Sequence, residues 1–219
     1  MMSLFFSGCS ITWGDELEDR LNERYSTLVS NHYGCQHYNL SERGISNDNI
    51  VRNAIKYLQN YNPDVVIIQF TVASRMEYYQ VNEKICRFTI QPTFIPPELK
   101  QTHRDYYTKV YNEVLGVENM WKNIFLFDAY CKSVGQKYIS LVADHFDPSI
   151  RKPEKFYKFG NGYWRGLCKD YEPVWMHMGL LQHTKENPNY YANGLSGGHP
   201  SAEGHKVIAN KIIELIDTI

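Results

Sequence analysis

Short, continuous apolar runs punctuate this chain, and each is bounded by polar or turn-forming residues. Runs of this kind are typical of strands that are buried on both faces of a parallel sheet. The clearest is "VVIIQF" within "NPDVVIIQF" at 62–70, and two similar runs are Ser3–Ser7 and Lys137–Val142. A weaker run, Gln36–Leu40, predicts a further strand.

Four other segments repeat apolar residues every three to four positions, which predicts helices with one face toward a core. These predicted helices are Asp15–Asn31, Asn47–Asn60, Thr102–Gln136 with a break near Gly116, and Ser201–Ile216. Strands that alternate with helices along the chain favour an α/β fold. We therefore predict a three-layer α/β/α arrangement whose mainly parallel sheet is covered on both faces.

The length of 219 residues suits a single domain that spans residues 1–219. Two stretches interrupt the alternation of strands and helices, at about 85–101 and at 144–198. The second is polar, aromatic and rich in proline. Because a structureless loop of that length is uncommon in a compact domain, we predict that both stretches are insertions and that the longer one has short elements of its own.

The composition narrows the classes of partner. Hydrophobic residues make up 43% of the chain and charged residues 21%, which is typical of a globular protein with a sizeable core. The formal net charge of -1 gives no electrostatic footprint for a nucleic acid or an anionic membrane, so we expect neither as a partner. No stretch approaches the length needed to span a bilayer. The oligomeric state is left open by the sequence.

The cysteines and histidines indicate neither disulfides nor a metal. The five cysteines are scattered and form no CxxC pair, so reduced thiols in a cytoplasmic protein are the simpler interpretation. The N-terminus has no basic region before its apolar run, and we predict no signal peptide. The eight histidines show no HxH or HExxH spacing, so no metal is expected.

Residues that could take part in catalysis follow the ends of the predicted strands. Ligands of an open parallel sheet bind beyond the carboxyl ends of its strands. "GCS" follows the first predicted strand, "NLSERGISNDN" the second and "TVASR" the third, while "GGHPSAEGH" precedes the last helix. A histidine is the usual base for a serine nucleophile, and a glycine turn or a helix N-terminus supplies N–H donors for an oxyanion. From these residues alone, Ser10 is either a nucleophile or a small residue in a turn.

Three motifs resemble those of the SGNH (GDSL-type) hydrolases: "GCSITWGDEL" near the start, Gly44 in "NLSERGISNDN", and "GGHPSAEGHKVIANKI" near the end. In that superfamily the serine directly follows the first strand. Its last block has a histidine followed by proline and then a "GH" pair that opens the final helix. The resemblance covers about half of the chain, because the region 85–198 carries no matching motif.

The resemblance implies a flavodoxin-like SGNH hydrolase fold and a Ser-His hydrolase of esters that uses no cofactor. Ser10 is then the nucleophile, His199 the general base, and the N–H of Gly44 an oxyanion donor. Gly44 also fits a turn that needs a positive φ angle, and the two roles are compatible. The implied substrate is an acyl or acetyl ester of a carbohydrate, a lipid or a small molecule.

The chain departs from the family's third motif, GxND. Alignment on the strand places Thr71 at the glycine and Ala73 at the asparagine. The third oxyanion donor is therefore missing or replaced, with Thr71 or Ser74 as candidates. Asn47, after the second strand, is either the N-cap of the second long helix or a substrate contact.

The family's acid, three residues before its histidine, falls on Ser196. This leaves either a Ser10–His199 dyad or an acid recruited from the insertion. Loss of the orienting acid slows hydrolysis greatly without abolishing it. The alternative is a weak or inactive relative that binds a glycan or a protein partner in the same cleft.

Three residues close in sequence to the candidate site residues are expected to have no catalytic role. We expect Cys9 to be a small buried residue and His205 to be structural. Arg75 is expected to pair with Glu77 at the surface rather than to hold an anionic group of a substrate.

Overall fold

The computed structural model describes residues 2–79, 85–88, 95, 97–143, 174–175, 181, 190 and 199–219. Its main sheet has five parallel strands in the order β2-β1-β3-β6-β7. These strands are β1 (Ser3–Ser7), β2 (Gln36–Asn39), β3 (Val65–Phe70), β6 (Tyr138–Val142) and β7 (Val174–Trp175). Every residue of β3 is buried, as its continuous apolar run predicts.

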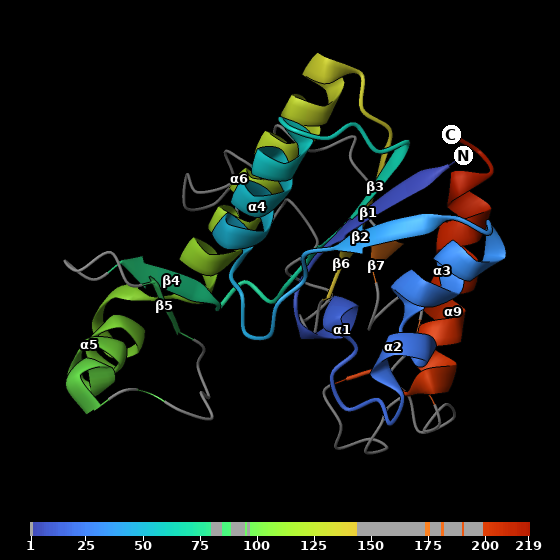
Figure 1. The fold of residues 1–219 in the computed structure, drawn as a ribbon. Helices are drawn as coiled ribbons and strands as arrows, with labels where there is room; N and C mark the ends of the chain where they lie inside the picture. The colour runs from blue at the N-terminus through green and yellow to red at the C-terminus, as the bar shows by residue number, and fades with distance from the viewer. Residues whose placement is uncertain are drawn as a thin grey trace.

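Helices cover both faces of this sheet (Figure 1). On one face, α4 (Asn47–Leu58) packs against α6 (Glu113–Val134). On the other face, α3 (Tyr25–His32) packs against α9 (Ala202–Ile216). The predicted α/β/α layers and mainly parallel sheet are thus confirmed.

The helix predicted over Asp15–Asn31 is wrong. Two short helices lie there instead, α2 (Arg20–Glu23) and α3, and a third, α1 (Ser10–Trp13), comes just before them. Gly14 ends α1 in the left-handed region with φ of 86°. Arg24 is extended, with ψ of 143°, and separates α2 from α3. The loop between α1 and α2 is therefore free to fold back toward the carboxyl ends of the strands.

The break predicted near Gly116 lies a few residues earlier. The chain forms η1 (Pro97–Leu99), α5 (Lys100–Asp105) and the π-helical turn η2 (Tyr106–Val110) before α6 begins. Asn112 caps α6 because its Oδ1 accepts a hydrogen bond from the N–H of Leu115 at 2.9 Å, so Gly116 lies inside the helix. A small antiparallel pair, β4 (Met76–Tyr79) and β5 (Ile85–Phe88), also lies outside the predicted elements.

The docking of α9 brings the C-terminal part of the chain to the N-terminal part. Ser201 caps α9 by accepting a hydrogen bond from the N–H of Gly204 at 3.2 Å. One turn into the helix, the buried His205 accepts a hydrogen bond at Nδ1 from the N–H of Tyr25 at 3.2 Å and stacks on its ring. This contact fixes the start of α9 against the start of α3.

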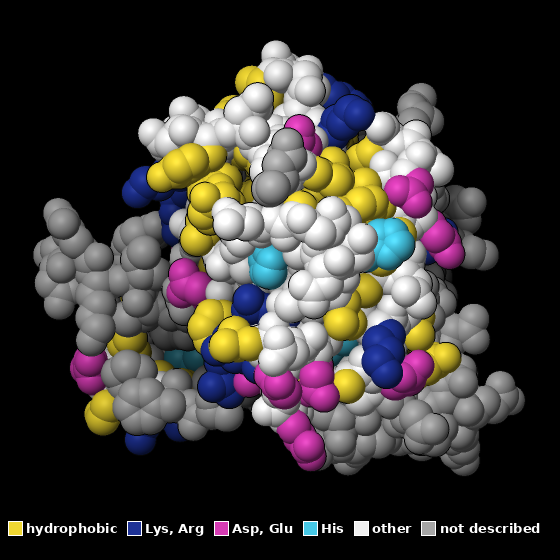
Figure 2. Space-filling model, turned by 45° about the vertical axis from the view of Figure 1, so that its right-hand side comes forward, with side chains coloured by type: hydrophobic (Ala, Val, Ile, Leu, Met, Phe, Trp, Pro, Cys, Tyr) yellow, Lys and Arg dark blue, Asp and Glu magenta, His cyan; other side chains and the backbone are white. Residues whose placement is uncertain are grey.

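The outer surface is of mixed charge. On the face shown in Figure 2, acidic and basic side chains lie next to one another rather than in separate regions of one sign, in keeping with a formal net charge of -1. Among the helices that the structure describes, none is both long enough and apolar enough to cross a membrane.

Candidate active site

Ser10 follows β1, the strand at which the order of strands in the sheet reverses. β1 pairs with β2 on one side and with β3 on the other, and crevices at such switch points are the usual ligand sites of open α/β sheets. The chain leaves β1 at Ser7, passes through Gly8 and Cys9, and begins α1 at Ser10. As the first residue of a helical turn, Ser10 has a backbone N–H without an intrahelical acceptor.

The buried Gln69 of β3 holds this turn in place. Its Oε1 accepts hydrogen bonds from the N–H of Cys9 at 3.1 Å and from the hydroxyl of Thr12 at 3.0 Å. Since Thr12 donates to Gln69, its bond of 2.6 Å with the hydroxyl of Tyr25 is one in which Tyr25 donates. The turn around Ser10 is therefore tied to the central strand and to α3.

Gly8 is needed for this close approach. A Cβ at this position would lie 2.2 Å from Oγ1 of Thr12 and 2.9 Å from Cβ of Gln69. A glycine lets the turn pack directly against the side chains that anchor it.

The structure brings Ser10 and His199 together. Oγ of Ser10 lies 2.8 Å from Nε2 of His199, within hydrogen-bond reach, although the two residues are 189 positions apart. Ser10 is buried and the side chain of His199 is partly exposed, at 21%. A neutral imidazole nitrogen at this distance can accept the serine proton.

Two carboxylates of the loop after α1 lie beside His199. Oε1 of Glu16 is 3.2 Å from Nδ1, although this nitrogen makes no aligned hydrogen bond. Oδ2 of Asp15 is 3.9 Å from Nε2, and Asp15 is engaged by Nε of Arg43 at 2.9 Å. Glu16 therefore faces the ring nitrogen opposite the one that contacts Ser10.

The backbone of Glu16 is unusual. Its φ of 68° lies in the left-handed region, and Glu16 is alone in this among the described residues other than glycine. A side chain other than glycine costs conformational energy in this region, so such residues are uncommon and concentrate at functional sites. Here the conformation turns a carboxylate toward His199.

Gly44, in the loop between β2 and α4, has a φ of 68°, which confirms the expected positive-φ turn. Asn47 is not the N-cap of α4, because Ser46 caps this helix by accepting from the N–H of Asn49 at 3.3 Å. The amide of Asn47 instead clamps the backbone of Thr71: Oδ1 accepts from its N–H at 2.8 Å and Nδ2 donates to its carbonyl at 3.1 Å. A substrate contact by Asn47 stays a prediction.

The clamp leaves Thr71 one group that can donate to a ligand. Its backbone N–H is already bonded to Asn47, so this donor is the hydroxyl. Ser74, in the same loop, accepts a hydrogen bond at its carbonyl from the hydroxyl of Tyr107 at 2.8 Å. The donor roles of Thr71 and Ser74 stay predictions.

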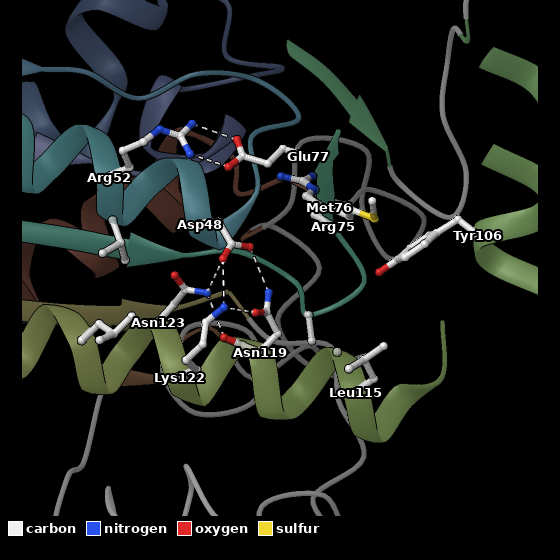
Figure 3. Close-up of a pocket in the computed structure, with 14 residues that line it drawn as sticks. Asp48, Arg52, Arg75, Met76, Glu77, Tyr106, Leu115, Asn119, Lys122 and Asn123 are labelled. Atoms are coloured by element: carbon white, nitrogen blue, oxygen red, sulfur yellow. Dashed lines mark hydrogen bonds and ion pairs between the residues drawn. The ribbon is translucent and has the colours of Figure 1, made fainter. Parts of the chain in front are cut away.

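The expected surface pair of Arg75 and Glu77 is wrong. The carboxylate of Glu77 forms a two-point ion pair with the guanidinium of Arg52 on α4 (Figure 3). The two residues can meet because β4, which carries Glu77, lies against α4. Nη1 of Arg75 is buried and has no hydrogen-bond partner among the described residues.

Cys9 is buried, as the sequence predicts, and His205, which was expected to be structural, is buried as well. Burial raises the pKa of the Cys9 thiol, but the positive charge of Arg75 and hydrogen bonds from neighbouring groups outweigh it, so the pKa lies below its usual value. Burial, and to a lesser extent the charge of His199, lowers the pKa of His205 to about 3. His205 is thus a neutral, structural histidine at physiological pH.

Sequence reasoning missed Gln69 and Glu16. A glutamine inside an otherwise apolar buried strand was a usable signal, because a buried amide needs partners. Glu16 gave no comparable signal, since its role depends on a backbone conformation and on a residue at the far end of the chain. Ser196, which aligns with the acid of the family motif, and most of the region 144–198 lie outside the described residues.

Comparisons by sequence find no relative: no family model matches the chain, and no curated protein matches it. Comparison of the fold does find similar solved structures. A member of the lipolytic protein G-D-S-L family from Veillonella parvula aligns over all of both chains, with 10% identity and a TM-score of 0.56. The chain has the SGNH hydrolase fold.

Other solved structures with the SGNH hydrolase fold agree. The psychrotrophic esterase EstA from Pseudoalteromonas, in a structure inhibited by monoethylphosphonate, aligns with 100% of this chain and 98% of its own, at 11% identity and a TM-score of 0.55. A family two carbohydrate esterase from Clostridium thermocellum, in complex with cellohexaose, aligns with 99% of this chain and 64% of its own, at 12% identity and a TM-score of 0.53.

Proposed function

We propose that this protein is an ester hydrolase that forms an acyl-enzyme on Ser10. The observation that carries the proposal is the distance of 2.8 Å between Oγ of Ser10 and Nε2 of His199 at the switch point of an SGNH hydrolase fold. A serine hydroxyl is a weak nucleophile at neutral pH, and a base within hydrogen-bond reach is what activates it.

The reaction follows from this pair. His199 takes the proton of Ser10 at Nε2 while Oγ attacks the carbonyl carbon of the ester. The imidazolium then gives this proton to the leaving alcohol as the tetrahedral intermediate collapses to the acyl-enzyme. In the second half, His199 takes a proton from water, the resulting hydroxide attacks the acyl carbon, and the proton returns to Oγ of Ser10 as the acid leaves.

Glu16 acts as a positioning residue for His199. A proton on Nδ1 would face Oε1 of Glu16 at 3.2 Å and leave the lone pair of Nε2 toward Ser10. The carboxylate also stabilises the imidazolium that forms during each half of the reaction. The contact is not yet aligned as a hydrogen bond, and such contacts commonly tighten when substrate binds. The acid would then come from the loop after α1, and not from the last block of the family or from the insertion.

The oxyanion would be held by backbone N–H groups. That of Ser10 lies in the first turn of α1, and that of Gly44 lies in a positive-φ turn after β2. The hydroxyl of Thr71 or Ser74 would replace the asparagine of the family motif. Because Asn47 clamps the Thr71 backbone, this loop is held rigidly enough to serve as a preorganised donor site.

The substrate that we propose is a small ester, including an acetyl or acyl ester of a carbohydrate or lipid. The esterase and carbohydrate esterase among the structural neighbours support this range. The reaction needs no cofactor.

The test is hydrolysis of short-chain 4-nitrophenyl esters. We expect turnover by the natural protein, a loss of about a thousandfold or more in Ser10→Ala and in His199→Ala, and unchanged rates in the exposed control Ser133→Ala. A fluorophosphonate should label Ser10 in the natural protein and not in Ser10→Ala. An absence of both Ser10-dependent turnover and labelling would leave a binding protein as the function of the same cleft.

A further inference from the structure

A pocket of about 640 Å³ lies between α4, α6 and the loop that follows β3 (Figure 3). This volume is in the range that holds a small organic ligand. Its wall includes Ala73, two residues beyond Thr71, and Asp48, which follows Asn47. The pocket is therefore lined in part by the two segments that also carry the candidate site residues Asn47 and Thr71.

Most charges in this pocket are matched in pairs. Arg52 is paired with Glu77, and Nζ of Lys122 lies 3.2 Å from Oδ1 of Asp48. Asp48 also accepts hydrogen bonds from the amides of Asn119 and Asn123. Burial raises the pKa of this carboxyl, but its hydrogen bonds and the charge of Lys122 outweigh this effect and lower it, so Asp48 is ionised at neutral pH.

Arg75 is the exception. Among the described residues no carboxylate pairs with it, and its Nη1 is buried without a hydrogen-bond partner. A buried guanidinium donor that lacks a partner is costly, so such groups normally bind a carboxylate, a phosphate or another acceptor. In Figure 3 no hydrogen bond or ion pair joins Arg75 to the Arg52–Glu77 pair or to Asp48. The pocket therefore has one positive charge that its own side chains leave uncompensated.

Arg75 also lies near the nucleophile. Its positive charge is the strongest of the influences that lower the pKa of the Cys9 thiol against the opposing effect of burial. Cys9 immediately precedes Ser10, whose hydroxyl is 3.8 Å from the Cys9 sulfur. The charge of Arg75 thus acts on the residue that precedes Ser10, which is why an anionic group of a bound ester is a fitting partner for it.

We propose that Arg75 is a specificity-determining residue that selects esters carrying a second, anionic group, which binds at its unpartnered guanidinium in this pocket. The ion pair would offset the cost of the buried donor, and the paired charges around it would exclude a second anion. This inference rests on the proposed ester hydrolysis and narrows its substrate class from esters in general to those of a carboxylate-bearing acid or alcohol.

The test compares matched neutral and anionic esters on both sides of the scissile bond. For the acyl side, the substrates are 4-nitrophenyl hydrogen adipate and 4-nitrophenyl hexanoate. For the alcohol side, they are 4-acetoxybenzoate and its methyl ester. On one of the two sides, we expect the natural protein to prefer the anionic ester. We expect Arg75→Gln to lower the anionic-to-neutral ratio of kcat/KM about ten- to a hundredfold. Arg75→Lys should lose less, because it keeps the charge.

The exposed Arg104→Gln is the control, since it removes the same charge at a distant helix and should leave both ratios unchanged. Thermal unfolding of each variant identifies any that fail to fold. Equal losses of Arg75→Gln on neutral and anionic esters would overturn the proposal, because Arg75 would then act on the reacting centre that all esters share. Unchanged ratios on both sides would overturn it as well.

A binding measurement separates this proposal from the hydrolase itself. Adipate is titrated by calorimetry into Ser10→Ala and into Ser10→Ala with Arg75→Gln, neither of which needs to turn over. Binding that weakens at least tenfold on loss of Arg75 supports the anion site even where no ester is hydrolysed. Ester turnover that depends on Ser10, together with no adipate binding or binding that ignores Arg75, refutes the anion site and leaves the hydrolase standing.

Discussion

Oε1 of Gln69 accepts a hydrogen bond from the backbone N–H of Cys9 at 3.1 Å, which ties the residue before the candidate nucleophile to the central strand of the sheet. The same oxygen also accepts from the Cys9 thiol and from the Thr12 hydroxyl. One buried amide thus fixes both ends of the short turn that presents Ser10. The contribution of Gln69 is to hold Ser10 in position, because a nucleophile must lie within a fraction of an ångström of its working position.

Replacement of Gln69 by Met should therefore affect both stability and activity. The change keeps the volume but leaves the buried donors of Cys9 and Thr12 without their acceptor, so we expect the free energy of unfolding to fall by about 2 kcal/mol. We also expect kcat/KM to fall, because the turn loses its anchor. Urea unfolding and ester hydrolysis measure the two effects. The exposed Gln59→Met is the control, and equal stability of the two variants would contradict the anchoring role.

Glu16 offers a test in which activity and stability move in opposite directions. Glu16→Gln removes the charge that faces Nδ1 of His199, and we expect kcat to fall about ten- to a hundredfold. The loss should be smaller than for a fully buried acid, because this side chain is 35% exposed. Glu16→Gly should lose as much activity yet gain about 1 kcal/mol in stability, since glycine adopts a φ of 68° without strain.

The neighbouring Glu18→Gln serves as the control for both Glu16 variants, because it removes a charge from an exposed position of the same loop. Full activity in Glu16→Gln would show that Ser10 and His199 work as a dyad. A loss of stability in Glu16→Gly would show that the Glu16 side chain contributes more to the fold than its backbone strain costs.

Gly8→Ala should destabilise the protein through a steric clash. The added Cβ would meet Oγ1 of Thr12 at 2.2 Å, so the turn must move away from its anchor, at a cost of about 1–3 kcal/mol. Gly34→Ala is a useful contrast, since it meets nothing within 4 Å and pays only for its φ of 57°. Chemical denaturation of the two variants compares a clash with backbone strain, and activity should fall only in Gly8→Ala.

His205 should make the fold sensitive to acid. Its pKa is about 3 when folded, against an ordinary value of 6.5, so below pH 6.5 the unfolded chain takes up a proton that the folded chain does not. This group alone should lower the free energy of unfolding by about 1.4 kcal/mol per pH unit as the pH falls from 6.5 toward 3, and should have no effect above 6.5.

Unfolding by urea at a series of pH values tests this dependence. His205→Gln keeps an acceptor for the N–H of Tyr25 but cannot be protonated, so its stability should fall less steeply in this range. The exposed His32→Gln should behave as the natural protein does. Identical slopes in all three proteins would refute the assignment.

The strands were the most predictable part of the fold. A strand such as β3, covered by helices on both faces, must be apolar along its whole length, and this pattern is visible in the sequence. The loop after α1 was not predictable in the same way. Leu17, Leu21 and Leu28 have the spacing of a continuous helix, yet Leu21 is 56% exposed. Local backbone angles at Gly14 and Arg24 decide the outcome there, and apolar spacing does not encode them.

The residues of the candidate site also differ in how far the sequence predicts them. Ser10 and His199 were predicted because their motifs follow a strand and precede a helix, and parallel strands gather such positions at one edge. The contact of Glu16 with His199 joins two distant loops through a strained residue, and the sequence has no local pattern for it. The pairing of Arg52 with Glu77 was missed for a similar reason, since it depends on where β4 lies relative to α4.

If Ser10 and His199 are the proposed catalytic pair, the docking of α9 on α3 makes catalysis depend on how the two ends of the chain close together. Ser10 and Glu16 share one short N-terminal segment, whereas His199 arrives with the helix that the Tyr25–His205 contact holds. If α9 detached locally, the base would leave the nucleophile while the sheet stayed intact. The proposed catalysis would then be lost before the core melts, and ester hydrolysis would report on the position of the last helix rather than on global unfolding.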